Sequence, residues 1–164
     1  AKVANMEDEA YRKELEVLHG GTAPRPLLAF RDGKTSGAAS CEGCHPAETA
    51  HWKGTPHSTA MMLLQKDTET PDCVRCHATP SAMGLTADVT EAPRFEESVG
   101  CESCHGPGDA HVAAGGGTGN IEGLGEDCPV CVIEAICTRC HTPEWDKDWA
   151  LERELALVKH HTAP

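Results

Sequence analysis

The chain has 164 residues, and its 14 Lys and Arg against 26 Asp and Glu give a formal net charge of −12 with neutral histidines. This charge argues against a nucleic-acid partner, because phosphates are recognised by basic surfaces. Leu, Ile, Val and Phe make up only 25 residues, about 15% of the chain, which is less than a chain normally needs to build its own core. The ten cysteines and ten histidines therefore indicate that a bound group supplies the missing core.

The first predicted helix covers Met6–His19. Its apolar residues Tyr11, Leu15 and Leu18 recur at helical spacing, and two glycines follow its last residue. His19 lies on the same apolar stripe, one turn after Leu15. This position distinguishes His19 from a surface histidine.

Two further helices are predicted at 57–66 and 144–161. Each follows a Thr-Pro pair, which offers a capping hydroxyl and then a proline at the first helical position. The last helix would carry two of the three tryptophans one turn apart. The segments 78–100 and 106–125 are rich in Gly, Pro, Thr and Ala and predict little regular structure. The expected fold class is mainly α with long irregular loops and little or no sheet.

No stretch reaches the roughly 18 to 20 apolar residues that cross a bilayer. The first residues, Ala1–Asp8, lack a basic segment followed by an apolar run. We therefore expect no membrane span, and a soluble chain or a mature one whose signal has been removed.

Eight of the ten cysteines belong to four copies of one string, Cys-x-x-Cys-His. The first cysteines of successive copies lie 32, 28 and 36 residues apart, and the residues between copies do not repeat. The copies therefore indicate four binding stations in one domain rather than four domains. The string residues are Cys41, Cys44 and His45; Cys73, Cys76 and His77; Cys101, Cys104 and His105; and Cys137, Cys140 and His141.

In such a string the two thiols form thioethers with the vinyl groups of one haem, and the histidine is delivered to one face of its iron. A redox dithiol, a structural zinc site or a disulfide framework would use the thiols. None of these gives a reason for a histidine after every second cysteine. The sequence therefore predicts four covalent haem c groups, whose macrocycles would form the core, with zinc as the main alternative.

A fifth pair, Cys128 and Cys131, is followed by Val132 in place of a histidine. Three interpretations stay open: a disulfide, local or to another chain; a zinc site shared with Cys137 and Cys140; and a fifth haem. An oxidising compartment favours the disulfide. The zinc site would take the thiols of the fourth haem, and the fifth haem would lack its proximal histidine.

The second axial ligands decide the function, because a six-coordinate iron suits electron transfer whereas an open position invites ligand binding or chemistry. Six histidines remain outside the strings, enough to close all four irons. We predict His57, His111 and His160 as distal ligands, with His51 and His161 in reserve. The alternative for the two C-terminal histidines is a cation at a helix end.

His19 is the fourth candidate distal ligand, to a haem of its own chain or of a neighbouring chain. The alternative is a core histidine satisfied by hydrogen bonds. Four methionines, at positions 6, 61, 62 and 83, offer thioether ligands that would raise the potential. Methionine more commonly fills gaps in a core, so we favour histidine on both faces of each iron and low potentials.

These residues resemble two related groups, the small tetrahaem cytochromes c that accept electrons from hydroxylamine oxidoreductase and the extracellular tetrahaem cytochromes that polymerise into filaments. The resemblance runs from Cys41 to about His161. Its specific parts are Cys41-x-x-Cys44-His45-Pro46 with Trp52 and His57, Cys101-x-x-Cys104-His105-Gly106-Pro107-Gly108 with His111, and Cys137-x-x-Cys140-His141-Thr142-Pro143-Glu144.

The resemblance implies that His57 and His111 are distal ligands to haems attached by other strings. It also implies haems stacked in alternating parallel and perpendicular pairs. The Cys128/Cys131 pair and the leading segment 1–40 depart from the family pattern. We therefore expect two parts, a leading arm at 1–40 that is suited to subunit contact and the tetrahaem domain at 41–164.

The predicted function is electron transfer rather than catalysis. One form is a shuttle that meets redox proteins through acidic patches; the other is the subunit of a head-to-tail filament, which the leading arm and His19 favour. The alternatives are a reductase of small nitrogen or sulfur oxides at one five-coordinate haem, and a haem-holding sensor or structural module. Because haem c is attached outside the cytoplasm, a periplasmic or extracellular location is expected.

Overall fold

The computed structural model describes residues 33–64, 71–80, 82, 94–125, 128 and 130–160. Over these residues the chain forms short helices and no strand, and the β pairing is limited to an isolated bridge between Thr79 and Arg94. The predicted mainly helical fold is confirmed. The α-helices and the two 3-10 helices (η) are α2 (Ala38–Glu42), α3 (Pro46–Lys53), η2 (Pro56–Leu63), α4 (Pro71–His77), η5 (Phe95–Glu97), α5 (Glu102–His105), α6 (Asp109–Ala113), α7 (Val130–Cys137) and α8 (Leu151–Val158).

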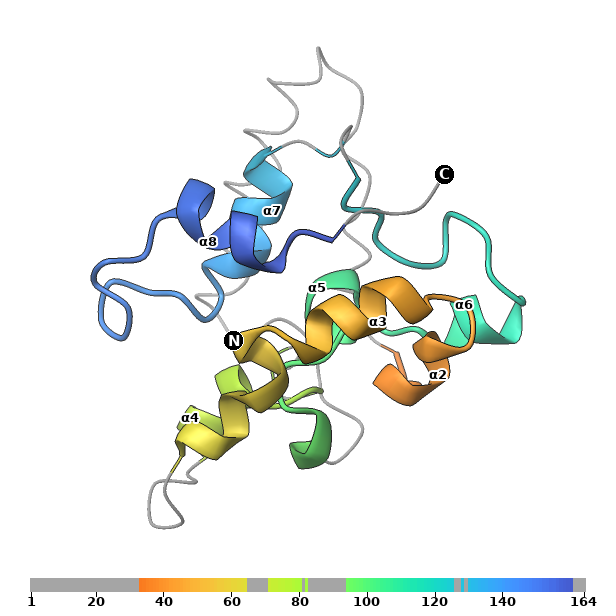
Figure 1. Ribbon diagram of the computed structural model, residues 1–164, viewed down its shortest axis with the longest axis horizontal. Helices are drawn as coiled ribbons and strands as arrows, with labels where there is room; N and C mark the ends of the chain where they lie inside the picture. The colour runs from red at the N-terminus through yellow and green to blue at the C-terminus, as the bar shows by residue number, and fades with distance from the viewer. Residues whose placement is uncertain are drawn as a thin grey trace.

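Helix α2 packs against α3, and η2 contacts α3, α4 and η5. In Figure 1 the C-terminal helices α7 and α8 (blue) lie above α4 (yellow), α5 (green) lies in the middle beside α3, and α6 (turquoise) lies at the right-hand side with α2. In the part of the chain that the structure describes, no helix has the length and hydrophobicity to cross a membrane. The described part of the chain thus consists of short helices joined by loops, and these helices do not form a continuous helical bundle.

Among the residues that the structure describes, the buried hydrophobic side chains are few and small. Four of the seven are alanines, and the largest cluster consists of Val132 and Ile136, with Leu124 and three cysteines packed partly against it. Side chains of this size bury little apolar area, so they contribute little free energy to holding the helices together. The seven residues are Ala38, Ala60, Val74, Ala78, Ala82, Val132 and Ile136.

The helix predicted at 57–66 is the 3-10 helix η2, which begins at Pro56 and ends at Leu63. Proline occupies the first position as expected, but the expected cap is wrong. The hydroxyl of Thr55 donates to the carbonyl of Trp52 at 2.8 Å and caps nothing. The backbone N–H of Met61 donates to Ser98 Oγ at 3.1 Å. This contact to another segment stabilises the 3-10 conformation.

The helix predicted at 144–161 is also wrong over its first half. Helix α8 begins only at Leu151, after Ala150 in extended conformation. The preceding residues form turns, in which the N–H groups of Trp145 and Asp146 both donate to the carbonyl of Thr142. The buried hydroxyl of Thr142 has no hydrogen-bond partner in the described part of the chain, so it does not cap the helix.

The described parts of the segments predicted to be irregular, 78–80, 82, 94–100 and 106–125, are mostly irregular. Gly115, Gly116 and Gly117 all have positive φ, which excludes a regular helix or strand there. Two short helices, η5 and α6, interrupt these segments. The predicted helix 6–19 and most of the leading segment 1–40 lie outside the described residues.

Glu102 joins three loops of the fold. This side chain is 1% exposed, and its carboxylate accepts hydrogen bonds from the backbone N–H groups of Ser36, Gly37 and Gly108 at 2.8, 2.8 and 2.6 Å. Gly108 must be a glycine for this approach, because a Cβ there would lie 2.9 Å from the carboxylate oxygen. The carboxylate thus fixes residues 36–37 and the start of α6 against the third string.

Glu102→Ala should therefore lower the free energy of unfolding by about 3 kcal/mol or more, since it leaves buried N–H groups without an acceptor. The matched control is Glu96→Ala, at an exposed position of η5, which should change the stability by less than about 0.5 kcal/mol. Thermal melts of the two purified variants measure the difference. Equal melting temperatures would contradict this role of Glu102.

Candidate haem-binding site

Each of the four strings forms a single helical turn. The backbone N–H of His45, His105 and His141 donates to the carbonyl of the first cysteine of its own string at 2.8, 3.0 and 3.0 Å. The second string lies inside α4, which ends at His77. One turn brings residues i, i+3 and i+4 to the same face of the helix. Both thiols and the imidazole of every string are therefore directed to one side, as attachment to a single haem requires.

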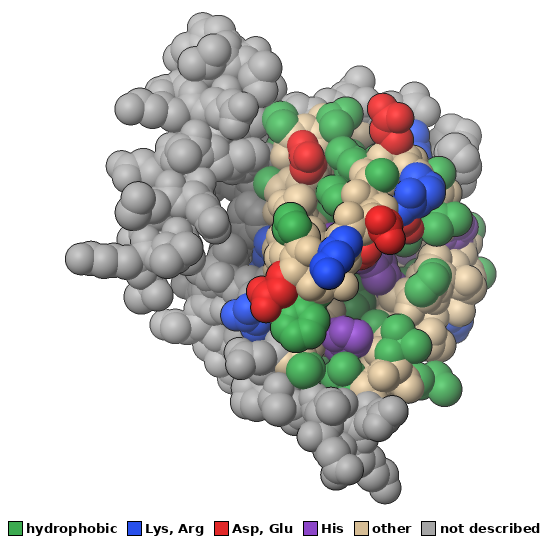
Figure 2. All heavy atoms as spheres, turned by 90° about the vertical axis from the view of Figure 1, so that its left-hand side faces the viewer, with side chains coloured by type: hydrophobic (Ala, Val, Ile, Leu, Met, Phe, Trp, Pro, Cys, Tyr) green, Lys and Arg blue, Asp and Glu red, His purple; other side chains and the backbone are tan. Residues whose placement is uncertain are grey.

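Three string histidines face a histidine from outside the strings. The ring centroids of His45 and His111 are 6.3 Å apart, and those of His57 and His141 are 6.1 Å apart. The ring of His105 lies 5.9 Å from that of His160. Histidine side chains also lie among hydrophobic ones on the face seen in Figure 2.

These separations fit an iron between two imidazoles. With metal–nitrogen bonds of about 2 Å on both sides, the ring centroids would be about 6 Å apart. Each of the three pairs joins one string histidine to a histidine distant in the chain. The donor sets therefore fit haem c, and the chemistry that this group supplies is one-electron oxidation and reduction of its iron.

His77 differs from the other string histidines. In the part of the chain that the structure describes, no histidine ring is stacked on it or facing it. Its Nδ1 lies 2.8 Å from the carbonyl oxygen of Ala60. Two of the predicted ligand candidates, His19 and His161, lie outside the described residues.

Hydrogen bonds orient several of these imidazoles. Nδ1 of His105 lies 2.6 Å from the carbonyl oxygen of Glu122, and Nδ1 of His111 lies 3.0 Å from that of Gly117. Nδ1 of His141 lies 2.8 Å from the carboxylate of Asp146. Each acceptor favours the proton on Nδ1 and leaves Nε2 with a lone pair, which is how metal-binding histidines are held.

Burial lowers the pKa of His57, with the nearby His141 acting in the same direction. Burial is also the main reason why the pKa values of His105 and His160 are lowered. A lowered pKa keeps the imidazole neutral, and the neutral form is the one that binds a metal. His51 is exposed and lies 6.4 Å from His160, edge to face.

Cysteines of different strings are neighbours in space, and these contacts show how the four strings are arranged. Cys101 of the third string is the main neighbour that raises the pKa of Cys41 in the first string, and Cys76 of the second string does the same for Cys140 in the fourth. The buried thiol of Cys104 in the third string interacts with Cys137 in the fourth. The third and fourth strings thus lie between the first and the second.

Arg139, inside the fourth string, was not expected to have a role. It is buried, which lowers the pKa of its guanidinium, and it interacts with the thiols of Cys76, Cys104 and Cys140. It also donates a hydrogen bond to the carbonyl of Ala82. A positive charge is therefore buried where three strings converge.

Two further residues of the site escaped the sequence analysis. Asp146 binds His141, as described above, and the ring of Trp149 stacks on His141 at 5.6 Å with an angle of 21° between planes. Both lie in the stretch that was predicted to be helical. The signal for Asp146 was its place as the first acidic side chain after the turn Thr142-Pro143-Glu144, five residues beyond the histidine.

The fifth cysteine pair packs near the strings. Cys128 and Cys131 lie partly against the Val132–Ile136 cluster, as does Cys104. The zinc alternative requires Cys128, Cys131, Cys137 and Cys140 around one ion. Over the described residues, no three His, Cys, Asp or Glu side chains are grouped to hold a metal ion.

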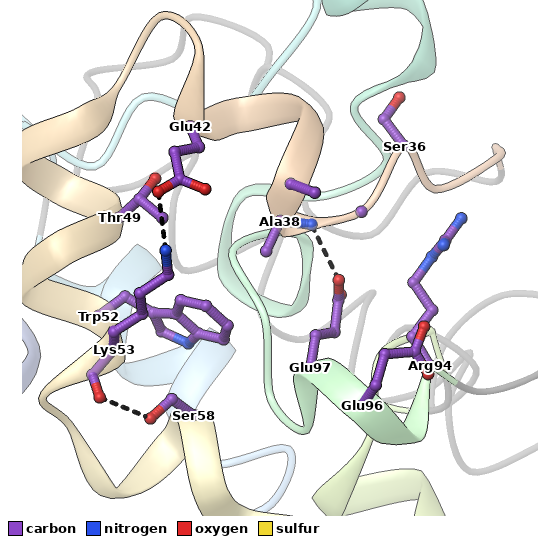
Figure 3. Close-up of a pocket in the computed structure, with 12 residues that line it drawn as sticks. Ser36, Ala38, Glu42, Thr49, Trp52, Lys53, Ser58, Arg94, Glu96 and Glu97 are labelled. Carbon is purple, nitrogen blue, oxygen red and sulfur yellow. Dashed lines mark hydrogen bonds and ion pairs between the residues drawn. The ribbon is translucent and has the colours of Figure 1, made fainter.

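A pocket of about 430 Å³ lies between α2, α3 and the Arg94–Glu97 segment. Figure 3 shows Trp52 at its wall, Lys53 bonded to Glu42, and Glu97 accepting from the N–H of Ala38. Burial raises the pKa of Glu97. No cysteine or histidine lines this pocket, so it is separate from the paired imidazoles.

Comparison with known proteins found two similarities. Residues 40–106 match the family described as cytochrome c554 and c-prime. Cytochrome c-554 of Nitrosomonas europaea is 36% identical over 96 residues, which cover 47% of this chain and 40% of that protein. The chain resembles a cytochrome c554. The predicted resemblance is therefore confirmed.

The matched segment contains the first three strings and ends just after His105, whereas the fourth string lies beyond it. A cytochrome c carries covalently bound haem, so the similarity supports haem c with its iron as the cofactor. No solved structure matches the chain.

Proposed function

We propose that this chain is an electron-transfer protein that holds four haem c groups, one at each string. The observation that carries this proposal is the set of three histidine pairs with ring centroids 5.9 to 6.3 Å apart, each with one string histidine. Two imidazoles close both axial positions of an iron, which favours electron transfer over substrate binding.

In this proposal the eight string cysteines anchor the haems and the four string histidines are the proximal ligands. His111 is the distal ligand opposite His45, His57 opposite His141, and His160 opposite His105. The contacts between strings support a linear order, first, third, fourth and second. Arg139 is suited to pair with a haem propionate where three strings meet.

The distal ligand of the iron at His77 decides between the shuttle, the filament subunit and the reductase. We propose that His19 completes its iron, from the same chain in a shuttle and from a neighbouring chain in a filament. An open position at His77 would instead support the reduction of a small molecule. The net charge of −12 suits a basic redox partner, and a periplasmic or extracellular location follows from haem attachment.

Electron paramagnetic resonance of the oxidised native protein tests this proposal, recorded on the assembled form and again after dissociation to single chains. We expect only low-spin haems in the assembly and one high-spin haem per chain after dissociation, because a neighbour's His19 would be removed. His19→Ala should give the same high-spin signal without dissociation.

A protein that stays low-spin as a single chain, and in which His19→Ala alone produces the high-spin haem, is a shuttle with all ligands in one chain. A high-spin haem in every state would contradict full closure and favour the reductase. A native preparation without covalent haem would overturn the proposed function altogether.

A further inference from the structure

The pair Cys128 and Cys131 has no part in the proposed haem attachment. No histidine follows it, and the four-thiol zinc site is not formed among the described residues. A purely structural disulfide between residues three positions apart would close a very short loop and remove little entropy from the unfolded chain. The gain in stability would therefore be smaller than that of a disulfide that closes a long loop. Cysteines spaced Cys-x-x-Cys are typical of couples that cycle between dithiol and disulfide.

The surroundings of the pair point to the haem anchors. Cys128, Cys131 and Cys104 all pack against the same two side chains, Val132 and Ile136. Cys104 is the second anchor of the third string. The fifth pair therefore shares one small hydrophobic cluster with a haem-attaching cysteine.

Helix α7 makes a second connection. It runs from Val130 to Cys137, so it carries Cys131 in its first turn and the first anchor of the fourth string at its end. Six residues of helix span about 9 Å. The pair is therefore adjacent to the attachment points of two haems, from the third and the fourth string.

The structure shows Cys128 and Cys131 in the dithiol form. We propose that oxidation joins them in a disulfide, which the haems of the third and fourth strings reduce reversibly to the dithiol. This inference rests on the proposed function. The disulfide accepts one electron from each of two ferrous haems and two protons from water. Its S–S bond breaks, two thiols form, and two ferric haems remain. The reverse reaction returns the electrons, so the chain stores two electrons beyond those of its irons.

Anaerobic titration of the holoprotein with dithionite tests the electron count, with haem reduction followed by absorbance. We expect the native chain to take up two more electrons per chain than the double variant Cys128→Ser, Cys131→Ser. Val130→Ala is the matched control, because this side chain lies between the two cysteines, is 61% exposed and leaves the pair intact. It should take up as many electrons as the native chain.

Alkylation with N-ethylmaleimide provides a readout on the native protein that needs no variant. Samples with successive degrees of haem reduction are alkylated and digested. The mass of the peptide that carries Cys128 and Cys131 is then measured by mass spectrometry. We expect both thiols to become labelled as the haems become reduced and to be protected again after reoxidation.

The inference would be overturned by equal electron counts in the native and double-variant chains. It would also fail if the pair were alkylated fully in the oxidised protein, or not at all in the reduced one. Haem content, measured before the titration, separates these results from failure of the proposed function, because a chain without covalent haem would overturn both.

Discussion

The chain made without covalently attached haem should be largely unfolded. In the part of the chain that the structure describes, the buried hydrophobic side chains are four alanines, two valines and one isoleucine. Burial of side chains this small releases too little free energy to balance the conformational entropy of folding. Small domains that depend on a metal behave in the same way, since binding free energy is folding free energy. Far-ultraviolet circular dichroism and a thermal melt measure the effect.

The test variant replaces the eight string cysteines with Ser and keeps Cys128 and Cys131. Its matched control is the native chain, loaded with haem and purified in the same way. We expect a native-like spectrum and a cooperative melt only from the control. A cooperative melt of the haem-free variant would show that its side chains form a sufficient core on their own.

Removal of a distal histidine should change the spin state of one haem and leave the others unaltered. His57→Ala leaves His141 without its facing ring, and His111→Ala does so for His45. Each variant should convert one low-spin haem per chain to high-spin, since one axial position becomes open. Electron paramagnetic resonance and the visible spectrum of the oxidised protein count the converted haems.

His51→Ala is the control for these variants. His51 is exposed, and its ring lies 6.4 Å from His160, edge to face, rather than opposite a string histidine. We expect this variant to stay low-spin at the three paired haems. If His57→Ala and His111→Ala matched His51→Ala, the observed ring pairs would not be axial pairs.

The local features of this molecule were accessible from sequence because they depend on neighbours in the chain. A Cys-x-x-Cys-His string needs only one helical turn to bring its three side chains together, and all four strings form that turn. The absence of strands from the described residues also follows from local composition, as expected from the many Gly, Pro, Thr and Ala residues.

The errors occur where distant contacts override local preference. The Thr142-Pro143 pair has the pattern of a helix start, but Asp146 and Trp149 are drawn to His141, and the helix begins only at Leu151. No periodicity in the sequence encodes that stacking. Tertiary contacts of this kind commonly override helix propensity.

Glu102 illustrates a second limit. It lies between the two cysteines of the third string. A charged side chain at such a position is expected to be exposed to solvent. Its role depends on backbone N–H groups of residues 36, 37 and 108. Such an acceptor is recognisable only when the loops that it joins are known.

The three facing histidine pairs have a mechanical consequence for the whole chain. They join positions 66, 84 and 55 residues apart, His45 to His111, His57 to His141 and His105 to His160. Bound through iron, each pair would act as a cross-link that closes a long loop. The three loops overlap, so no stretch between residues 45 and 160 lies outside a closed loop. Complete separation of the helices that carry these histidines would then require iron–histidine bonds to break.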